Sequence, residues 1–256
     1  MKKKVFKVLV FAGCFLFIWW IASKIVNKSL FLPSPIETFG MIAELFKTGT
    51  FFKNLGSSFL RVTAGIVIAA MISIPVGMGI AWFKPVSNIF KPVVDSFKYI
   101  PPTSFQPMLV LMLGIGEEMK VIFIAIAALF SFLPTVIQTC SEPIDKLKET
   151  AYTMGFSYKR MLVHCFIPYI MPSMLQSFIT LYSVGWTYVI LAESSNTKFG
   201  LGHLMYIGSA RGKTAMVFAA IVIIIVVSFL FDKLANKIVK HAFKWRFSDE
   251  KESASN

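Results

Sequence analysis

Residues 148–168, with the sequence KETAYTMGFSYKRMLVHCFIP, form a polar and basic stretch between two long apolar runs. A connection of a few residues is enough to join two membrane helices, so the length of this stretch indicates a further role. Gly155 can end a first helical segment by adopting a positive φ, and Ser157 can cap a second one. Pro168 suits the start of the next helix, where its missing N–H costs little. Two short helices hinged at a glycine predict non-covalent docking of a soluble partner; an ordinary basic loop is the alternative.

Residue types that form bonds with substrates or hold metals are scattered along the chain. The three cysteines and three histidines form no close pair and no zinc-binding spacing. The 13 acidic residues are dispersed, whereas a membrane enzyme would need clustered acids, histidines or a nucleophile with its base. We therefore expect neither a metal site nor an enzyme. The cysteines and histidines are Cys14, Cys140, Cys165, His164, His203 and His241.

The composition predicts an all-α integral membrane protein. The chain has 256 residues, of which 56% are hydrophobic and 15% charged, while about a quarter of a soluble domain is charged. A membrane-crossing helix needs about 20 apolar residues. Charge-free runs predict about six transmembrane helices, of which the third is interrupted by prolines. The runs lie within residues 7–24, 61–84, 98–117, 121–141, 166–192 and 214–231.

Basic residues predict the orientation of the chain. With the N-terminus in the cytoplasm, 17 of the 26 Lys and Arg residues fall in cytoplasmic segments, as the positive-inside rule requires. Both termini are then cytoplasmic, and residues 148–168 face the cytoplasm as well. The net charge of +13 is typical of loops that face anionic membrane lipid, so we expect no nucleic-acid partner.

Two segments outside the long apolar runs have a predicted structure. Ser34 to Glu37 has the pattern of a capping box with proline at the first helical position, so we expect an amphipathic helix there. It serves either as structural support or as a ligand site. Pro101 and Pro102 break the third run, and freed backbone groups survive in a membrane only inside protein or beside a wet cavity. Residues 102–107 are therefore either a wall of the translocation path or a simple packing kink.

Polar side chains within the spans are candidates for the translocation path. Such groups tend to face one another or a cavity, and they can equally serve only to hold helices together. Glu193 is either functional or a structural clamp to Lys198 or Arg211. The candidates are Gln106, Gln138, Gln176, Trp186 and Glu193.

The stretch from Glu149 to Pro168 resembles the EAA loop of ABC-importer permeases, which has the pattern E-A-A-x3-G-x9-I-x-L-P. Glu149, Ala151, Gly155 and Pro168 match. Three positions depart mildly: Thr150 replaces alanine, Cys165 isoleucine and Ile167 leucine. In that family the loop is a coupling helix held in a groove of the ATP-hydrolysing subunit. The resemblance implies ATPase coupling by Glu149, Ala151, Gly155 and Pro168. Met154 and Phe156 flank the hinge, and we expect them to supply apolar contact in that groove.

Most of the chain resembles the nitrate, sulfonate and taurine branch of these permeases, which includes thiamine-precursor permeases. The resemblance implies a type I ABC importer permease fold and transport of a small sulfonate-, nitrate-, taurine- or thiamine-precursor-like solute. It implies a transmembrane helix in 1–30, an extracytoplasmic segment in 31–56, a permease domain in 57–238 with its coupling loop at 142–166, and a cytoplasmic tail in 239–256. The supporting stretches are LPSP at 32–35, SSFLRVTAG at 57–65, IPPTSFQPMLVLMLGIGEEMKV at 100–121, Ala192-Glu193 with GLG at 200–202, and FKW at 243–245.

The resemblance also implies the partners. These are two copies of an ABC ATPase subunit, an extracytoplasmic solute-binding protein and a second permease chain in a homodimer, all at the plasma (inner) membrane and in contact with its lipid. The sequence has no G-x4-G-K-[ST] phosphate loop, so we expect no cofactor in this chain and place ATP and Mg in the partner ATPase. The alternative function is a secondary transporter without an ATPase partner, which would usually show repeated halves.

Overall fold

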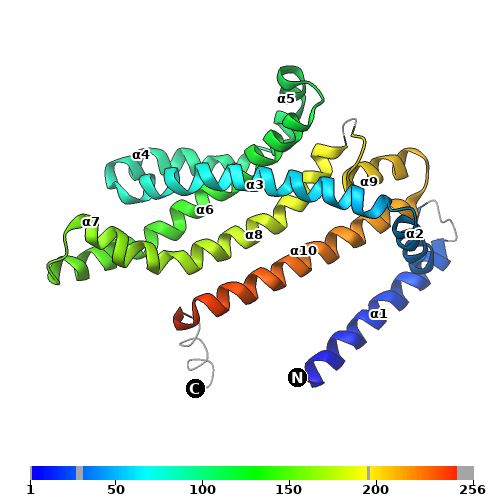
Figure 1. The fold of residues 1–256 in the computed structure, drawn as a ribbon, viewed down its shortest axis with the longest axis horizontal. Helices are drawn as coiled ribbons and strands as arrows, with labels where there is room; N and C mark the ends of the chain where they lie inside the picture. Colours follow the sequence, from blue (N-terminus) through cyan, green and yellow to red (C-terminus); the bar gives the residue numbers. More distant parts are fainter. Residues whose placement is uncertain (1, 27–30, 195–196, 247–256) are drawn as a thin grey trace. The chain divides into compact units, whose positions relative to one another are not determined.

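The structure, a computed structural model, describes residues 2–26, 31–194 and 197–246, and every regular element in these ranges is helical (Figure 1). The end of the predicted cytoplasmic tail, residues 247–256, lies outside the described residues. The elements in chain order are α1 Lys2–Val26, α2 Pro35–Lys47, α3 Thr50–Trp82, α4 Lys84–Asp95, η1 Ser96–Tyr99, η2 Pro102–Phe105, α5 Gln106–Leu113, α6 Glu117–Thr153, α7 Tyr158–Met161, η3 Leu162–Phe166, α8 Ile167–Glu193, α9 Leu201–Ala210 and α10 Thr214–Ala242.

Four helices of the described chain are long and apolar enough to cross a membrane, and α1 contributes a shorter apolar helix at Val10–Val26. The four long spans are Thr50–Trp82, Glu117–Ser141, Lys159–Glu193 and Thr214–Ala242. They coincide with the second, fourth, fifth and sixth predicted runs. The predicted all-α membrane fold is therefore confirmed.

The third predicted run, within residues 98–117, does not form one membrane-crossing helix. It divides into the two 3-10 turns η1 and η2 and the eight-residue helix α5. Eight residues rise only about 12 Å, well short of the hydrocarbon core of a bilayer. The cause is the proline content, because Pro101 and Pro102 cannot donate backbone hydrogen bonds and hold the preceding residue in an extended form.

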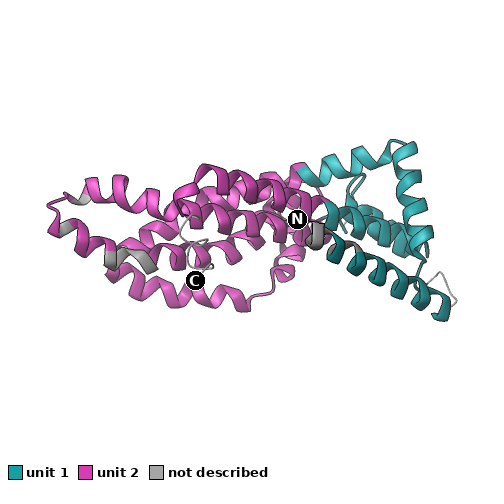
Figure 2. Ribbon diagram, turned by 90° about the horizontal axis from the view of Figure 1, so that it is seen from below, with its two compact units in different colours: residues 1–59, 193–226 teal, residues 60–192, 227–256 magenta. Residues whose placement is uncertain are grey.

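The chain divides into two compact units (Figure 2). The first comprises residues 1–59 and 193–226, and the second comprises residues 60–192 and 227–256. In the second unit α3 packs very closely against α6. A Cβ added to Gly65 would lie 2.6 Å from the Ile124 side chain, and one added to Gly77 would lie 2.5 Å from the Val136 side chain. Glycine at these two positions lets the helices approach, as small residues do in membrane bundles.

The predicted capping box at the start of α2 is confirmed in the first unit. The Ser34 N–H donates to the Glu37 carboxylate at 2.8 Å, and the Glu37 N–H donates to the Ser34 hydroxyl at 3.2 Å. Pro35 occupies the first turn. These bonds satisfy donors that an uncapped helix would leave without partners, which fixes where α2 begins.

Candidate coupling site and translocation path

The glycine hinge of the predicted docking segment is present. Gly155 has a φ of 72°, and the Phe156 N–H donates to the Ala151 carbonyl at 3.0 Å. This is the long bond of a Schellman motif, which ends a helix with a glycine in the left-handed region. The helix that it ends is not a separate short one, because α6 continues unbroken from Glu117 to Thr153. The end of α6 is thus rigidly continuous with a membrane span.

The second half of the segment is a four-residue helix, α7, followed by the π-helical turn η3 and then α8. The Ile167 N–H donates to the Leu162 carbonyl, five residues back, as a π-turn requires. In a regular α-helix the ring of Pro168 would clash with the carbonyl of His164, four residues earlier. A π-turn next to the proline is a recognised way to relieve such a clash, so Pro168 determines where α8 begins.

Both arms of the hinge are tied to the end of α3. The Lys148 ammonium donates to the Trp82 carbonyl at 3.3 Å and lies 4.9 Å from the centroid of the Trp82 ring. The same ring meets the ring of Phe166 edge-on, with centroids 4.9 Å apart. Sequence reasoning missed Trp82. An aromatic residue at the end of a charge-free run was the available signal, because tryptophan favours membrane interfaces.

Exposure separates the predicted coupling residues into two groups. Met154 is 70% exposed, and Glu149, Gly155 and Pro168 are exposed as well. Ala151 is buried, and Phe156 is half-buried. An exposed methionine is a flexible apolar side chain at the surface of the segment. Ala151 supports the packing of the segment on its own bundle instead.

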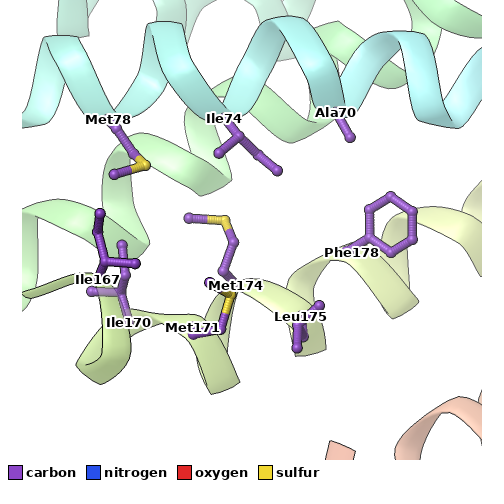
Figure 3. A pocket seen from close by; sticks show the side chains of 9 residues that line it. All are labelled: Ala70, Ile74, Met78, Ile167, Ile170, Met171, Met174, Leu175 and Phe178. Atoms are coloured by element: carbon purple, nitrogen blue, oxygen red, sulfur yellow. The ribbon is translucent and has the colours of Figure 1, made fainter. Parts of the chain in front are cut away.

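An apolar groove with a volume of about 310 Å³ lies between α3 and α8 in the second unit. Figure 3 shows its walls, in which side chains of α3 and α8 point toward one another. Met78 of α3 and Met171 and Met174 of α8 contribute flexible thioether side chains. The exposed lining of the groove is apolar, so it offers no polar group to a solute.

The predicted path residues do not form one cluster. Gln106 donates to the Leu191 carbonyl at 3.1 Å, whereas Gln176 lies 15 residues earlier on α8, about 22 Å along the helix axis. Gln138 is exposed on α6, and Gln176 is half-buried. Trp186 is 1% exposed, so its ring packs within the second unit.

Glu193 belongs to a buried capping cluster in the first unit, together with Asn54 and Ser58. Helix α9 has no side-chain cap from its own N-cap residue, Gly200. The N–H groups of Gly200, Leu201 and Gly202 instead donate to Asn54 at 2.7 Å, to the Ser58 hydroxyl at 2.8 Å and to the Glu193 carboxylate at 2.8 Å. Ser58 in turn donates to Glu193 at 2.8 Å. Three side chains from outside the helix thus cap α9, and two of them, Asn54 and Ser58, are distant in the sequence.

A partly polar cleft of about 330 Å³ lies between α6 and α8 in the second unit, and the apolar Phe132, Leu181 and Val184 form part of its lining. Four hydroxyl side chains line it: Ser131 and Thr135 of α6, and Ser177 and Thr180 of α8. Sequence reasoning missed these residues. Their spacing was the available signal, because residues four or three apart lie on one helix face. We name this feature the hydroxyl cleft.

One ionic cluster joins α3 to the start of α6. Arg61 binds the Glu117 carboxylate through two nitrogens, at 2.5 and 2.8 Å, and Lys120 binds it at 3.1 Å. Both cations are buried, whereas the side chain of Glu117 is 63% exposed. Within the described residues no group of three His, Cys, Asp or Glu side chains could hold a metal ion.

Comparison with known proteins agrees with this geometry. The taurine transport system permease protein TauC of Escherichia coli is 24% identical over 89% of this chain and 85% of its own length. The formylaminopyrimidine transport permease protein ThiX of Halalkalibacterium halodurans is 24% identical over 90% of this chain and 91% of its own length. A structure of the MetNI methionine ABC transporter in inward-facing conformations matches at 16% identity with a TM-score of 0.66, over 75% of this chain and 95% of that chain.

These matches confirm the predicted resemblance and the type I importer fold. The chain is a multi-pass inner-membrane subunit of an ABC importer, a transport subunit that works with an ATPase and a substrate-binding protein. A family model described as "Binding-protein-dependent transport system inner membrane component" matches residues 71–244. The chain therefore belongs to the family of binding-protein-dependent transport system inner membrane components.

Proposed function

We propose that residues 149–168 are the surface through which a separate ATPase subunit drives this permease. The observation that carries the proposal is an exposed Met154 beside the Gly155 hinge, on a segment whose two arms both reach Trp82. A partner that pulls on Met154 therefore pulls on α6, α8 and the end of α3 together. Rigid helices joined at one hinge transmit such a movement as a two-state switch.

Each coupling residue has a distinct part in this proposal. Met154 and Phe156 supply apolar contact to the ATPase groove, and Glu149 supplies a polar one. Gly155 provides the turn, Ala151 packs the segment on its own bundle, and Pro168 with its π-turn passes the movement into α8. ATP and Mg bind to the partner ATPase, and this chain performs no catalysis.

We infer a homodimer of permease chains with two ATPase copies below it. The positive-inside rule supports cytoplasmic termini and a cytoplasmic docking segment, since 17 of the 26 basic residues then face inward. The apolar groove between α3 and α8 would change shape as the two permease states interconvert.

The transported solute is a small sulfonate-, nitrate-, taurine- or thiamine-precursor-like molecule delivered by the binding protein. The functions in the names of TauC and ThiX support this range. Gln106, Gln138, Gln176, Trp186 and Glu193 remain the candidate path residues, of which exposed Gln138 is the best placed to meet a solute. Glu193 is fully buried, so its proposed part is indirect: it holds the capping cluster in place rather than contacting the solute.

The test is purification of the tagged chain from its own membranes in mild detergent, with partners identified by mass spectrometry. We expect a subunit with a phosphate-binding loop to co-purify with the unaltered chain. Gly155→Pro or Glu149→Lys should abolish its recovery and ATP-dependent uptake while membrane insertion persists. Gly155→Asn is the matched control, because asparagine tolerates a positive φ and should retain the ATPase. Uptake that continues without ATP or an ATPase would refute the proposal in favour of a secondary transporter.

A further inference from the structure

Each of the four hydroxyl groups that line the hydroxyl cleft donates to a backbone carbonyl of its own helix. Ser131 donates to the Ala127 carbonyl at 3.3 Å and Thr135 to the Ser131 carbonyl at 3.0 Å. Across the cleft, Ser177 donates to the carbonyl of Ser173 at 3.0 Å and Thr180 to that of Gln176 at 3.1 Å. Each hydroxyl oxygen still has a lone pair to offer. The cleft therefore presents acceptors.

A fifth hydroxyl, that of Tyr188, bonds to one of the four hydroxyls that line the cleft. The Tyr188 and Ser131 hydroxyls lie 3.0 Å apart. Either hydroxyl can be the donor of this bond, and each of the two oxygens keeps a lone pair. Redirecting any of these hydroxyls toward an anion would break the bond that it now makes.

Positive charge is absent from the helix segments that form the cleft. The sequence has no Lys or Arg in residues 121–141 of α6 or in residues 167–192 of α8. An oxyanion taken from water needs donors or a cation to replace its hydration, and this cleft supplies acceptors. A solute group with N–H donors can instead form hydrogen bonds to these acceptor oxygens.

Lipid is an unsuitable neighbour for this face. Ser131 and Thr180 are exposed in the chain, and hydrocarbon offers no donor to the lone pairs that their hydroxyl oxygens retain. Polar groups on membrane helices face one another or a water-filled cavity. A volume of about 330 Å³ is large enough for a small organic molecule.

We propose that the hydroxyl cleft is a translocation subsite for the N–H groups of the solute, so that the importer carries an alkylammonium or amino-substituted heterocycle rather than a bare oxyanion such as nitrate. This inference rests on the importer function proposed above and narrows its range of solutes. Thr135 and Thr180 are its specificity-determining residues. Taurine fits through its ammonium group and formylaminopyrimidine through its amino group.

Charged thiol reagents test the polarity of the cleft without knowledge of the natural solute. Thr180→Cys is placed in a chain whose three cysteines are replaced by serine, within the importer complex in its membrane. The complex is treated in turn with aminoethyl, trimethylammonioethyl and sulfonatoethyl methanethiosulfonate. The aminoethyl reagent carries N–H donors, the trimethylammonio reagent carries the same charge without donors, and the third is a sulfonate. Thr187→Cys, an exposed position two turns along α8, is the matched control.

We expect the aminoethyl reagent to modify Thr180→Cys fastest, after each rate is divided by that of free mercaptoethanol. Its advantage over both other reagents should be about fivefold, the factor given by one ordinary hydrogen bond, and it should be smaller at Thr187→Cys. A preference for the sulfonate, or equal rates, would overturn the proposal. Failure of all three reagents at a position where the complex still transports would also overturn it, because the face would then be a closed packing interface.

Uptake into vesicles that contain the importer and its binding protein gives a second readout. Labelled formylaminopyrimidine, taurine and nitrate are compared for the unaltered chain, Thr180→Val and Thr180→Ser. We expect transport of an amine-bearing probe, a KM raised about fivefold or more by Thr180→Val, and recovery by Thr180→Ser. ATP-dependent uptake of nitrate alone would overturn this inference while leaving the importer function intact. Loss of ATPase binding would instead count against the proposed function.

Discussion

Removal of Ser58 from the capping cluster should destabilise the chain more than removal of its neighbour Ser57. The Ser58 hydroxyl accepts the Leu201 N–H at 2.8 Å and donates to Glu193 at 2.8 Å, and both partners are fully buried. Ser58→Ala leaves the Leu201 N–H without its acceptor and the carboxylate without one of its donors. A polar group left in this way inside protein has no water to replace the lost bond.

The expected magnitude follows from these two bonds. An unsatisfied buried N–H costs about 1–3 kcal/mol, and a lost bond to a charged group adds about 1.5–3 kcal/mol. The sum is about 2.5–6 kcal/mol. At about 2–4 °C per kcal/mol for a chain of this size, the melting temperature should fall by at least about 5 °C.

The assay is thermal unfolding of the purified chain in one detergent, followed by loss of the monodisperse peak on size exclusion after heating. Ser57→Ala is the matched control, because the Ser57 hydroxyl bonds only to the Lys53 carbonyl of its own helix, in an exposed position. We expect Ser57→Ala to melt within about 2 °C of the unaltered chain, as surface substitutions usually do. Equal melting temperatures for the two variants would refute the idea that distant side chains cap α9.

A second substitution reaches the same cluster from the other side. Gly200 has a φ of 149°, and a Cβ there would lie 2.3 Å from a carboxylate oxygen of Glu193. Gly200→Ala should therefore lower the melting temperature, whereas Gly79→Ala on α3, with open space around the added carbon, should not. If both alanine variants have the same melting temperature, the Glu193 carboxylate does not lie against Gly200.

Three further predictions use the same melting assay or its counterpart in transport. Glu117→Gln should destabilise by about 1–3 kcal/mol, because it leaves two buried cations without their carboxylate, while Glu118→Gln should be nearly neutral; equal effects would contradict a role for the ionic cluster. Gly77→Ala should destabilise by about 1–3 kcal/mol through overpacking against Val136, and a melting temperature like that of the unaltered chain would show that the helices can separate at no cost. Lys148→Met should reduce ATP-dependent uptake while the ATPase still co-purifies, and unchanged uptake would exclude the tie to α3 from the coupling route.

The sequence determined the class of protein and the positions of its longest elements. Charge-free runs located four long spans because the bilayer core sets a minimum length for a continuous apolar helix. The capping box of α2 and the positive φ of Gly155 were also predictable, since both depend on residues within one turn. The family pattern around Glu149 and Pro168 was readable for the same reason.

Other features could not be predicted because they depend on packing between distant residues. Helix α6 continues from the apolar run into the polar segment, where the sequence suggested a separate short helix. Most helical stability comes from tertiary packing, which local pattern does not report. The third run does not form a continuous helix, because Pro101 and Pro102 restrict its backbone. The hydrophobicity of the run does not reveal this restriction.

The capping cluster around Glu193 and the hydroxyl cleft also depend on packing between distant residues. From the sequence, Glu193 was either functional or a structural clamp to Lys198 or Arg211, and Ser131, Thr135, Ser177 and Thr180 were not singled out. Only the tertiary structure brought Ser58 to Glu193, 135 residues apart, and set the hydroxyls of two helices across one cleft. Sequence fixes which groups a helix face carries, whereas the packing of helices decides which faces meet and so which hydrogen bonds a solute would find.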